Sequence, residues 1–157
     1  MRTADEIVQS FVENGFQHMK DIPNNKVFYT DNTASTLVWV ENNVVIEYYF
    51  LFPNKRTPMH SHPFANQVIF ISGDLTANLK KTDTADTVTI KLTDDDIGKI
   101  RPVTPINTIH GFDVGPAGAV IYNIQRWPDS VTNPISAALI YYGESMGPLH
   151  EQLMSNL

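Results

Sequence analysis

Residues 60–73 read HSHPFANQVIFISG, and this stretch decides the fold. His60 and His62 stand two positions apart, just ahead of a run of β-branched and aromatic residues. In an extended chain, residues i and i+2 point to the same face, so we expect both imidazoles to reach one metal ion. A third histidine, His110, follows the turn-like segment 105–109 and leads into another strand-like run. Histidine is the commonest side-chain metal ligand, so the pattern predicts a three-histidine metal site.

The composition predicts one globular domain spanning residues 1–157. Hydrophobic residues make up 42% of the 157 residues and charged residues 18%, which is typical of a chain with a sizeable core. The net charge is −6, and lysine and arginine nowhere form a run longer than two. We therefore expect no nucleic-acid partner, because such binding requires a basic patch.

Cysteine and long apolar segments are both missing from the sequence. Without cysteine, neither a disulfide framework nor a thiolate zinc site is possible. No apolar run approaches the roughly 20 residues that span a bilayer, so we expect no membrane association. The first residues include Asp5 and Glu6 and no apolar signal segment. These features favour a cytoplasmic location.

Strand-like segments dominate the middle of the chain, and helical patterns occur at its two ends. Thr3 and Glu6 form a capping-box pattern before a helical apolar repeat, so residues 1–20 are expected to form a helical arm. Residues 37–142 are expected to form an all-β barrel, and residues 147–157 a short C-terminal helix. The strands are predicted near 37–40, 44–52, 67–71, 75–80, 87–92, 108–114, 119–125 and 136–142.

Two short motifs in this chain resemble those of the cupin superfamily. The first cupin motif is Gly, five residues, His-x-His, three or four residues, Glu, six residues, Gly. The second is Gly, five residues, Pro-x-Gly, two residues, His, three residues, Asn. His60, His62 and Gly73 match the first motif, and Pro105 and His110 match the second. The resemblance implies a double-stranded β-helix, or jelly-roll barrel, with the three histidines around one divalent metal ion.

The chain departs from these motifs at the position of the usual carboxylate. Counting back from Gly73, the motif's glutamate falls on Asn66, and Gln67 with its longer side chain is adjacent. Either residue offers a neutral amide oxygen, which is expected to weaken metal binding and removes the usual carboxylate base. Asn66 and Gln67 both stand as candidates for a fourth ligand. Asn107 replaces the middle glycine of the second motif, and Val114 replaces its last asparagine.

The resemblance implies a metal-binding protein that acts on a small metabolite. Small bacterial cupins include dioxygenases, isomerases or epimerases, decarboxylases and lyases, and the sequence leaves the metal open among Fe, Mn, Ni, Zn and Co. The missing carboxylate keeps a second hypothesis open, a binding or sensing module without catalysis. We expect a homodimer, because open sheet edges need to be covered. Imidazole binds a metal only when neutral, so metal affinity is expected to fall as the pH drops through about 6.5.

Overall fold

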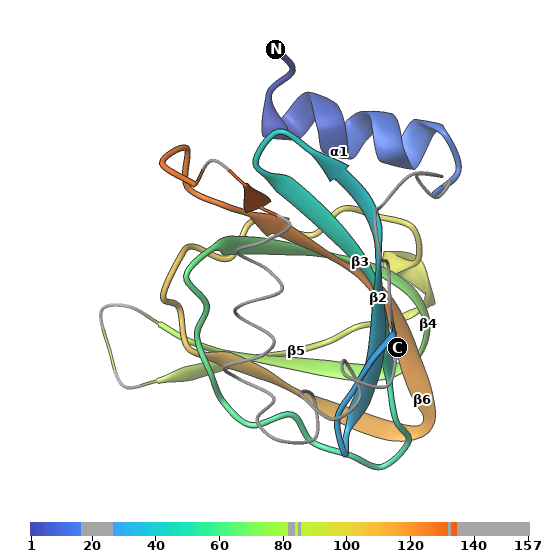
Figure 1. Ribbon diagram of the computed structural model, residues 1–157. Coiled ribbons are helices and arrows are strands. Elements are labelled where there is room, and N and C mark those ends of the chain that lie inside the picture. Colours follow the sequence, from blue (N-terminus) through green and yellow to red (C-terminus); the bar gives the residue numbers. More distant parts are fainter. Residues whose placement is uncertain (17–26, 82–83, 85, 132, 135–157) are drawn as a thin grey trace.

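The computed structural model describes residues 1–16, 27–81, 84, 86–131, 133 and 134. Within them the chain is mainly antiparallel β-sheet with one N-terminal helix, which confirms the predicted all-β class (Figure 1). The elements are α1 (Ala4–Glu13), β1 (Val27–Tyr29), β2 (Thr33–Glu41), β3 (Val44–Leu51), β4 (Ala65–Lys80), β5 (Thr87–Lys91), the 3₁₀ turn η1 (Asp94–Asp96) and β6 (His110–Arg126). The strand expected at 136–142, the C-terminal helix expected at 147–157, and residues 17–20 of the expected arm lie outside the described residues.

The strands form one six-stranded sheet in the order β1-β2-β3-β6-β4-β5. The sheet curls strongly, so that β4 and β6 run around the molecule together (Figure 1). Short bridged segments extend the sheet beyond the named strands: Ile100 and Thr104 pair along β4, and His60 pairs with His110 at the start of β6. One face of the curled sheet therefore turns inward, and the histidines lie at that face.

Two pairs of predicted strands are in fact two long continuous strands. The segments expected at 67–71 and 75–80 are both parts of β4, and those expected at 108–114 and 119–125 are both parts of β6. The glycines that suggested turns form register irregularities instead: Gly73 pairs with Ala119, while Leu75 pairs with Val114. The extra residues of β6 bulge out, and the strand bends without ending. The sequence prediction also missed β1 and the first residues of β2.

Helix α1 packs on the outer face of the sheet, as its apolar repeat predicts. The Thr3 hydroxyl accepts a hydrogen bond from the Glu6 backbone, and Glu6 accepts one from the Thr3 backbone, so the capping box is confirmed. The buried helix residues Ile7, Val8 and Phe11 share a core cluster with strand residues that include Ile46, Ile69 and Ile124. In the part of the chain that the structure describes, no helix is long and apolar enough to cross a membrane.

Gly73 is expected to be among the least tolerant positions of the barrel. Its φ is +101°, and a Cβ there would overlap the carbonyl oxygen of Gly118 on the paired strand. Gly73→Ala should therefore lower the free energy of unfolding by about 2–4 kcal/mol, because both the backbone angle and the strand spacing must change. Urea denaturation measures this loss. Gly98→Ala is the matched control, since Gly98 has a φ of +75° but open space around it, and should lose only about 1 kcal/mol. Equal losses would show that the close approach of β4 and β6 is not tight.

Candidate metal centre

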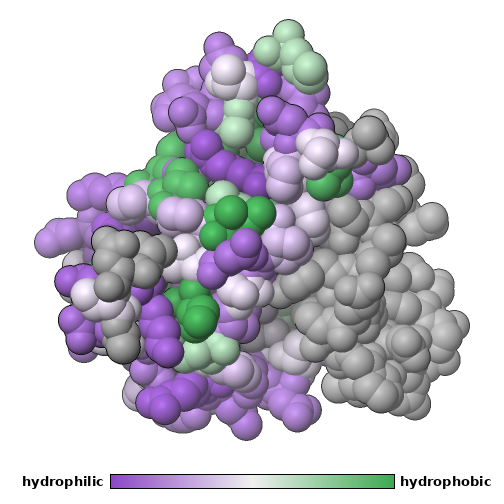
Figure 2. Space-filling model, turned by 90° about the vertical axis from the view of Figure 1, so that its left-hand side faces the viewer, coloured by the Kyte–Doolittle hydropathy of each residue, from purple (hydrophilic) through white to green (hydrophobic). Residues whose placement is uncertain are grey.

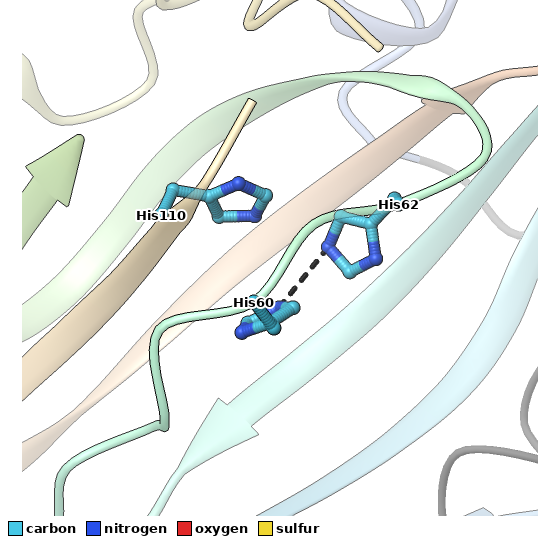
Figure 3. A group of neighbouring side chains, drawn as sticks. All are labelled: His60, His62 and His110. Atoms are coloured by element: carbon cyan, nitrogen blue, oxygen red, sulfur yellow. Dashed lines mark hydrogen bonds between the residues drawn. The ribbon is translucent and has the colours of Figure 1, made fainter. Parts of the chain in front are cut away.

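His60, His62 and His110 point toward one another from two segments that are far apart in the sequence (Figure 3). His60 and His62 lie in the extended segment before β4, and His110 is the first residue of β6. The backbones of His60 and His110 exchange two hydrogen bonds, of 2.9 and 2.8 Å, which fix the two segments side by side. The i, i+2 spacing then directs the His60 and His62 rings to the same side, as the sequence predicts.

Backbone carbonyls set the orientation of two of the imidazoles. The Nδ1 atom of His60 lies 2.6 Å from the carbonyl oxygen of Pro58, and Nδ1 of His110 lies 2.8 Å from that of Thr108. A carbonyl oxygen can only accept, so in both rings Nδ1 carries the proton and Nε2 carries the lone pair. This arrangement is typical of metal-binding histidines, whose second nitrogen is held by a neighbouring acceptor.

The three rings form a nearly equilateral group. Their centroids are 4.6, 4.7 and 4.8 Å apart, and the candidate ligand nitrogens all lie within 4.8 Å of one another. Nitrogens bound to one metal at about 2.1 Å are separated by roughly 3.0–3.5 Å. Nε2 of His60 and Nε2 of His62 are 3.2 Å apart, which already meets this requirement. The donor set therefore fits a divalent ion such as Zn, Fe, Mn, Co or Ni.

Burial lowers the pKa of two of the three imidazoles, His62 and His110. Burial, together with the neighbouring His60 and His110, lowers the pKa of His62 to about 3. Burial also lowers the pKa of His110, although its hydrogen bond to Thr108 opposes the shift. The His62 ring stacks on Phe64 at 4.6 Å and 8°, and Phe64 in turn contacts Trp127. Neutral imidazoles are the form that binds metal, so these shifts favour ligation at neutral pH.

The structure separates the two amide candidates for a fourth ligand. Asn66 is 5% exposed and lines the same cavity as the three histidines. Gln67 is the next residue of β4, so its side chain points to the opposite face. There its oxygen accepts hydrogen bonds from Arg126, and its nitrogen donates to the carbonyl oxygen of Arg101 at 3.1 Å. Of the two residues, Asn66 is the one that lines the cavity of the histidines, and its role as a fourth ligand stays a prediction.

A cavity of about 400 Å³ opens beside the histidine cluster. Its apolar walls are Phe64, Phe112 and Ile121, which come from the loop before β4 and from β6. Pro58 also lines the cavity, and the other described lining residues are polar: the three histidines, Thr30, Asn32, Thr33, Glu47, Tyr49, Thr57, Asn66 and Asn123. A second, smaller cavity of about 180 Å³ shares Asn66, His110 and Phe112 with it. A volume of about 400 Å³ is typical of sites for small metabolites.

Sequence reasoning missed Glu47 as a component of this site. Glu47 lies in β3, is 1% exposed, and lines the histidine cavity. Its partner across the sheet is Asn123 of β6, which also lines the cavity. The sequence did carry a signal: Glu47 is the one charged residue in the otherwise apolar and aromatic run 44–52. A charged residue inside such a run is a candidate for an inward-facing functional group.

Comparisons with known proteins identify the fold. The sequence matches no protein-family model and no curated protein. Among solved structures, the Lactobacillus farciminis oxalate decarboxylase formate complex is similar with a TM-score of 0.57 and 11% identity, covering 72% of this chain and 35% of that one. CapF, the capsular polysaccharide assembling protein of Staphylococcus aureus, has a TM-score of 0.54 and 12% identity over 69% of this chain and 30% of its own. AerE of Microcystis aeruginosa has a TM-score of 0.53 and 19% identity, and the match covers 66% of this chain and 46% of AerE.

These similarities place the chain in the cupin fold class. The curled antiparallel sheet, the N-terminal helix and the matched structures confirm the fold that the two motifs imply. The chain spans less than half the length of each of these structures. At identities of 11–19% the likeness establishes the fold and leaves the reaction to be argued from the site.

Proposed function

We propose that this chain binds one divalent metal ion through His60, His62 and His110 and acts there on a small metabolite. The reaction would be of the dioxygenase, isomerase or epimerase, or decarboxylase type. The observation that carries the proposal is the pair of Nδ1–carbonyl hydrogen bonds, which leaves Nε2 of His60 and of His110 as lone-pair donors in a partly buried cluster. Three protein nitrogens leave coordination positions open for a substrate, as catalytic metal sites require.

The residues around the cluster have separable tasks in this proposal. The bound metal would act as a Lewis acid toward a carbonyl or hydroxyl oxygen of the substrate. Phe64, Phe112 and Ile121 exclude water from one side of the cavity, which strengthens polar interactions inside it. Asn66, held by reciprocal backbone hydrogen bonds to Thr104, offers a fixed amide beside the histidines.

A second candidate function is binding or sensing without catalysis. It is favoured by the ligand group itself, because within the described residues the cluster holds three histidines and no carboxylate. A neutral ligand set binds divalent ions more weakly than one that includes a carboxylate. The two candidates are distinguished by whether a bound small molecule is released unchanged or transformed by the metal-loaded protein.

Metal analysis of the purified protein tests the proposal most directly. The protein should be purified without chelator and without a nickel resin, and its metal content measured by elemental analysis. We expect one ion per chain, and after removal by chelation a single site for added Mn²⁺, Co²⁺ or Zn²⁺. A protein that binds none of the metals named here would overturn the proposal.

Replacing Asn66 with a carboxylate should strengthen metal binding. Asn66→Glu adds a negative charge beside the three neutral histidines and should lower the Kd for Mn²⁺ by at least about tenfold, which equals about 1.4 kcal/mol. Gln67→Glu is the matched control, because Gln67 faces the other side of β4 and keeps its contact with Arg126 there. Calorimetric titration with Mn²⁺ measures the Kd of both variants. Tighter binding in Gln67→Glu alone would place the fourth ligand at residue 67.

We also propose that the chain forms a homodimer through a sheet edge. β1 and β5 are the outermost strands of the sheet, and Val27 and Tyr29 of β1 are 41% and 45% exposed. On the described part of the face drawn in Figure 2, hydrophobic side chains gather in small separate patches among hydrophilic ones, which favours a contact through a sheet edge. Light scattering coupled to size-exclusion chromatography measures the oligomeric state, and a monomer would contradict this proposal.

A further inference from the structure

We infer that the smaller cavity, of about 180 Å³, is an apolar subsite of the metal centre that takes an aromatic ring or a short branched alkyl group of the bound molecule. This role rests on the proposed function, because the same molecule would present its oxygen atoms to a metal at the three histidines. The ligand class is thereby narrowed to molecules with a polar end for the metal and an apolar end for the smaller cavity.

The two cavities adjoin at the histidine cluster. Asn66, His110 and Phe112 line both the cavity of about 400 Å³ and the smaller one. His110 is also one of the three proposed metal ligands, so the smaller cavity lies directly beside the metal position. A group attached next to the oxygen atoms of a metal-bound molecule is therefore within reach of it.

The wall that the sheet contributes to the smaller cavity is apolar. Its side chains come from β4, from β5 and the residue after it, and from the start of β6: Val68, Ala77, Leu79, Ile90, Leu92 and Phe112. An engineered cavity of roughly 150 Å³ with a lining of this kind binds benzene. At about 180 Å³, the smaller cavity has room for one ring or one branched alkyl group.

Two polar side chains of this cavity are engaged with other residues. The guanidinium of Arg101 donates to the carboxylate of Asp96 at 2.9 Å. The amide of Asn78 donates to Asp113 at 2.9 Å and accepts from the hydroxyl of Thr89 at 3.0 Å. The charge of Arg101 is therefore balanced by a carboxylate, and both ends of the Asn78 amide have partners. This arrangement favours an apolar group in the cavity over an anionic one.

A small residue at the centre of the wall leaves this space. Ala77 of β4 pairs with Ile90 of β5 on one side and with Phe112 of β6 on the other. Opposed side chains in neighbouring strands are close neighbours on one face, so Ala77 lies in a row between two large side chains. Ile90 and Phe112 are only partly buried and pack at the edge of a core cluster. Covering their accessible apolar surface with an apolar group is favourable.

The experiment compares two hydroxamic acids on the Mn²⁺-loaded protein. Acetohydroxamic acid and benzohydroxamic acid bind a metal through the same two oxygens, and they differ by a methyl against a phenyl group. Calorimetric titration gives the two dissociation constants, and their ratio is compared with the ratio for free Mn²⁺. We expect the protein to favour benzohydroxamic acid by at least about tenfold more than free Mn²⁺ does, because the ring leaves water for the apolar cavity.

Ala77→Leu should remove this preference. The larger side chain fills the space between Ile90 and Phe112, so the preference for the phenyl compound should fall by about tenfold. The dissociation constant of acetohydroxamic acid should stay unchanged, since its methyl group needs no room in the smaller cavity. Ala117→Leu is the matched control, because Ala117 is an exposed residue of β6 and is not among the described residues that line either cavity. Its ratio should equal that of the wild-type protein.

The outcomes separate this subsite from the proposed function. Equal ratios for the wild-type protein and free Mn²⁺, or a preference that persists in Ala77→Leu with Mn²⁺ still bound, overturn the subsite and leave the metal site intact. Loss of the preference in Ala117→Leu as well would indicate a general effect and also overturn it. If Ala77→Leu fails to fold, Ala77→Val, a smaller substitution that suits a strand, decides in the same way. A wild-type protein that binds none of the proposed metals overturns the proposed function and the subsite with it.

Discussion

His62→Ala protein should lose its bound metal while keeping the β-barrel. His62 provides one of three ligand nitrogens, and its Nε2 lies 3.2 Å from that of His60. Loss of a residue that only supports a ligand typically costs 10–100-fold in affinity, so loss of the ligand itself should cost at least about a hundredfold. The truncated ring also leaves a cavity against Phe64, which should reduce stability by about 1–3 kcal/mol. Elemental analysis and calorimetric titration measure the first effect, and circular dichroism with urea denaturation measures the second.

His18→Ala is the control for this experiment. His18 is a histidine outside both motifs, so its replacement should leave the metal content unchanged. Stoichiometric metal in His62→Ala would remove His62 from the ligand set. Loss of metal in both variants would indicate a general effect on folding instead of a local one.

The metal-free protein should lose stability steeply below about pH 6.5. In the folded chain the pKa of His62 is lowered to about 3, whereas an unfolded histidine titrates near 6.5. Between these values the unfolded state binds a proton that the folded state does not bind, so stability falls as the pH falls. For one such histidine, the free energy of unfolding falls by about 1.4 kcal/mol for each pH unit below 6.5. His62 alone should therefore cost the folded protein about 2 kcal/mol of stability by pH 5. His110, whose pKa is also lowered, adds to the loss in the same direction.

Urea denaturation at pH 7 and pH 5 checks this expectation. The His62→Ala variant should show a smaller difference between the two pH values, because it lacks the histidine with the largest shift. Bound metal should protect the wild-type protein, since ligation holds the imidazoles in their neutral form and stabilises the folded state. Equal stability of metal-free wild type at the two pH values would mean that His62 becomes protonated without unfolding the chain.

The structure also changes the pH at which we expect the metal to be released. From the sequence alone, metal release is expected near the usual histidine pKa of about 6.5. Burial and the two neighbouring imidazoles lower the pKa of His62, so protons compete with the metal for this ring only at a much lower pH. We therefore expect release below pH 6.5 to follow the loss of the folded state more than direct protonation of His62. Parallel curves for metal content and circular dichroism would support this coupling.

The sequence by itself determined the features that depend on neighbours along the chain. The capping box of α1 joins residues three apart, and the paired direction of His60 and His62 follows from the period of an extended chain. Motif spacing also identified His110 as the third histidine and implied the cupin fold. These features could be predicted because short-range geometry is nearly independent of the rest of the molecule.

Tertiary structure alone decided which distant residues meet and which face each one occupies. Glu47 and Asn123 are 76 positions apart, and they adjoin because β3 pairs with β6. Likewise, only the pairing of β4 shows that Asn66 faces the histidines while Gln67 faces Arg126. The bulges near Gly73 join segments that local turn signals had divided. Strand pairing and bulges depend on long-range hydrogen bonds and core packing, and a shift of one residue reverses every side chain, so local patterns do not determine them.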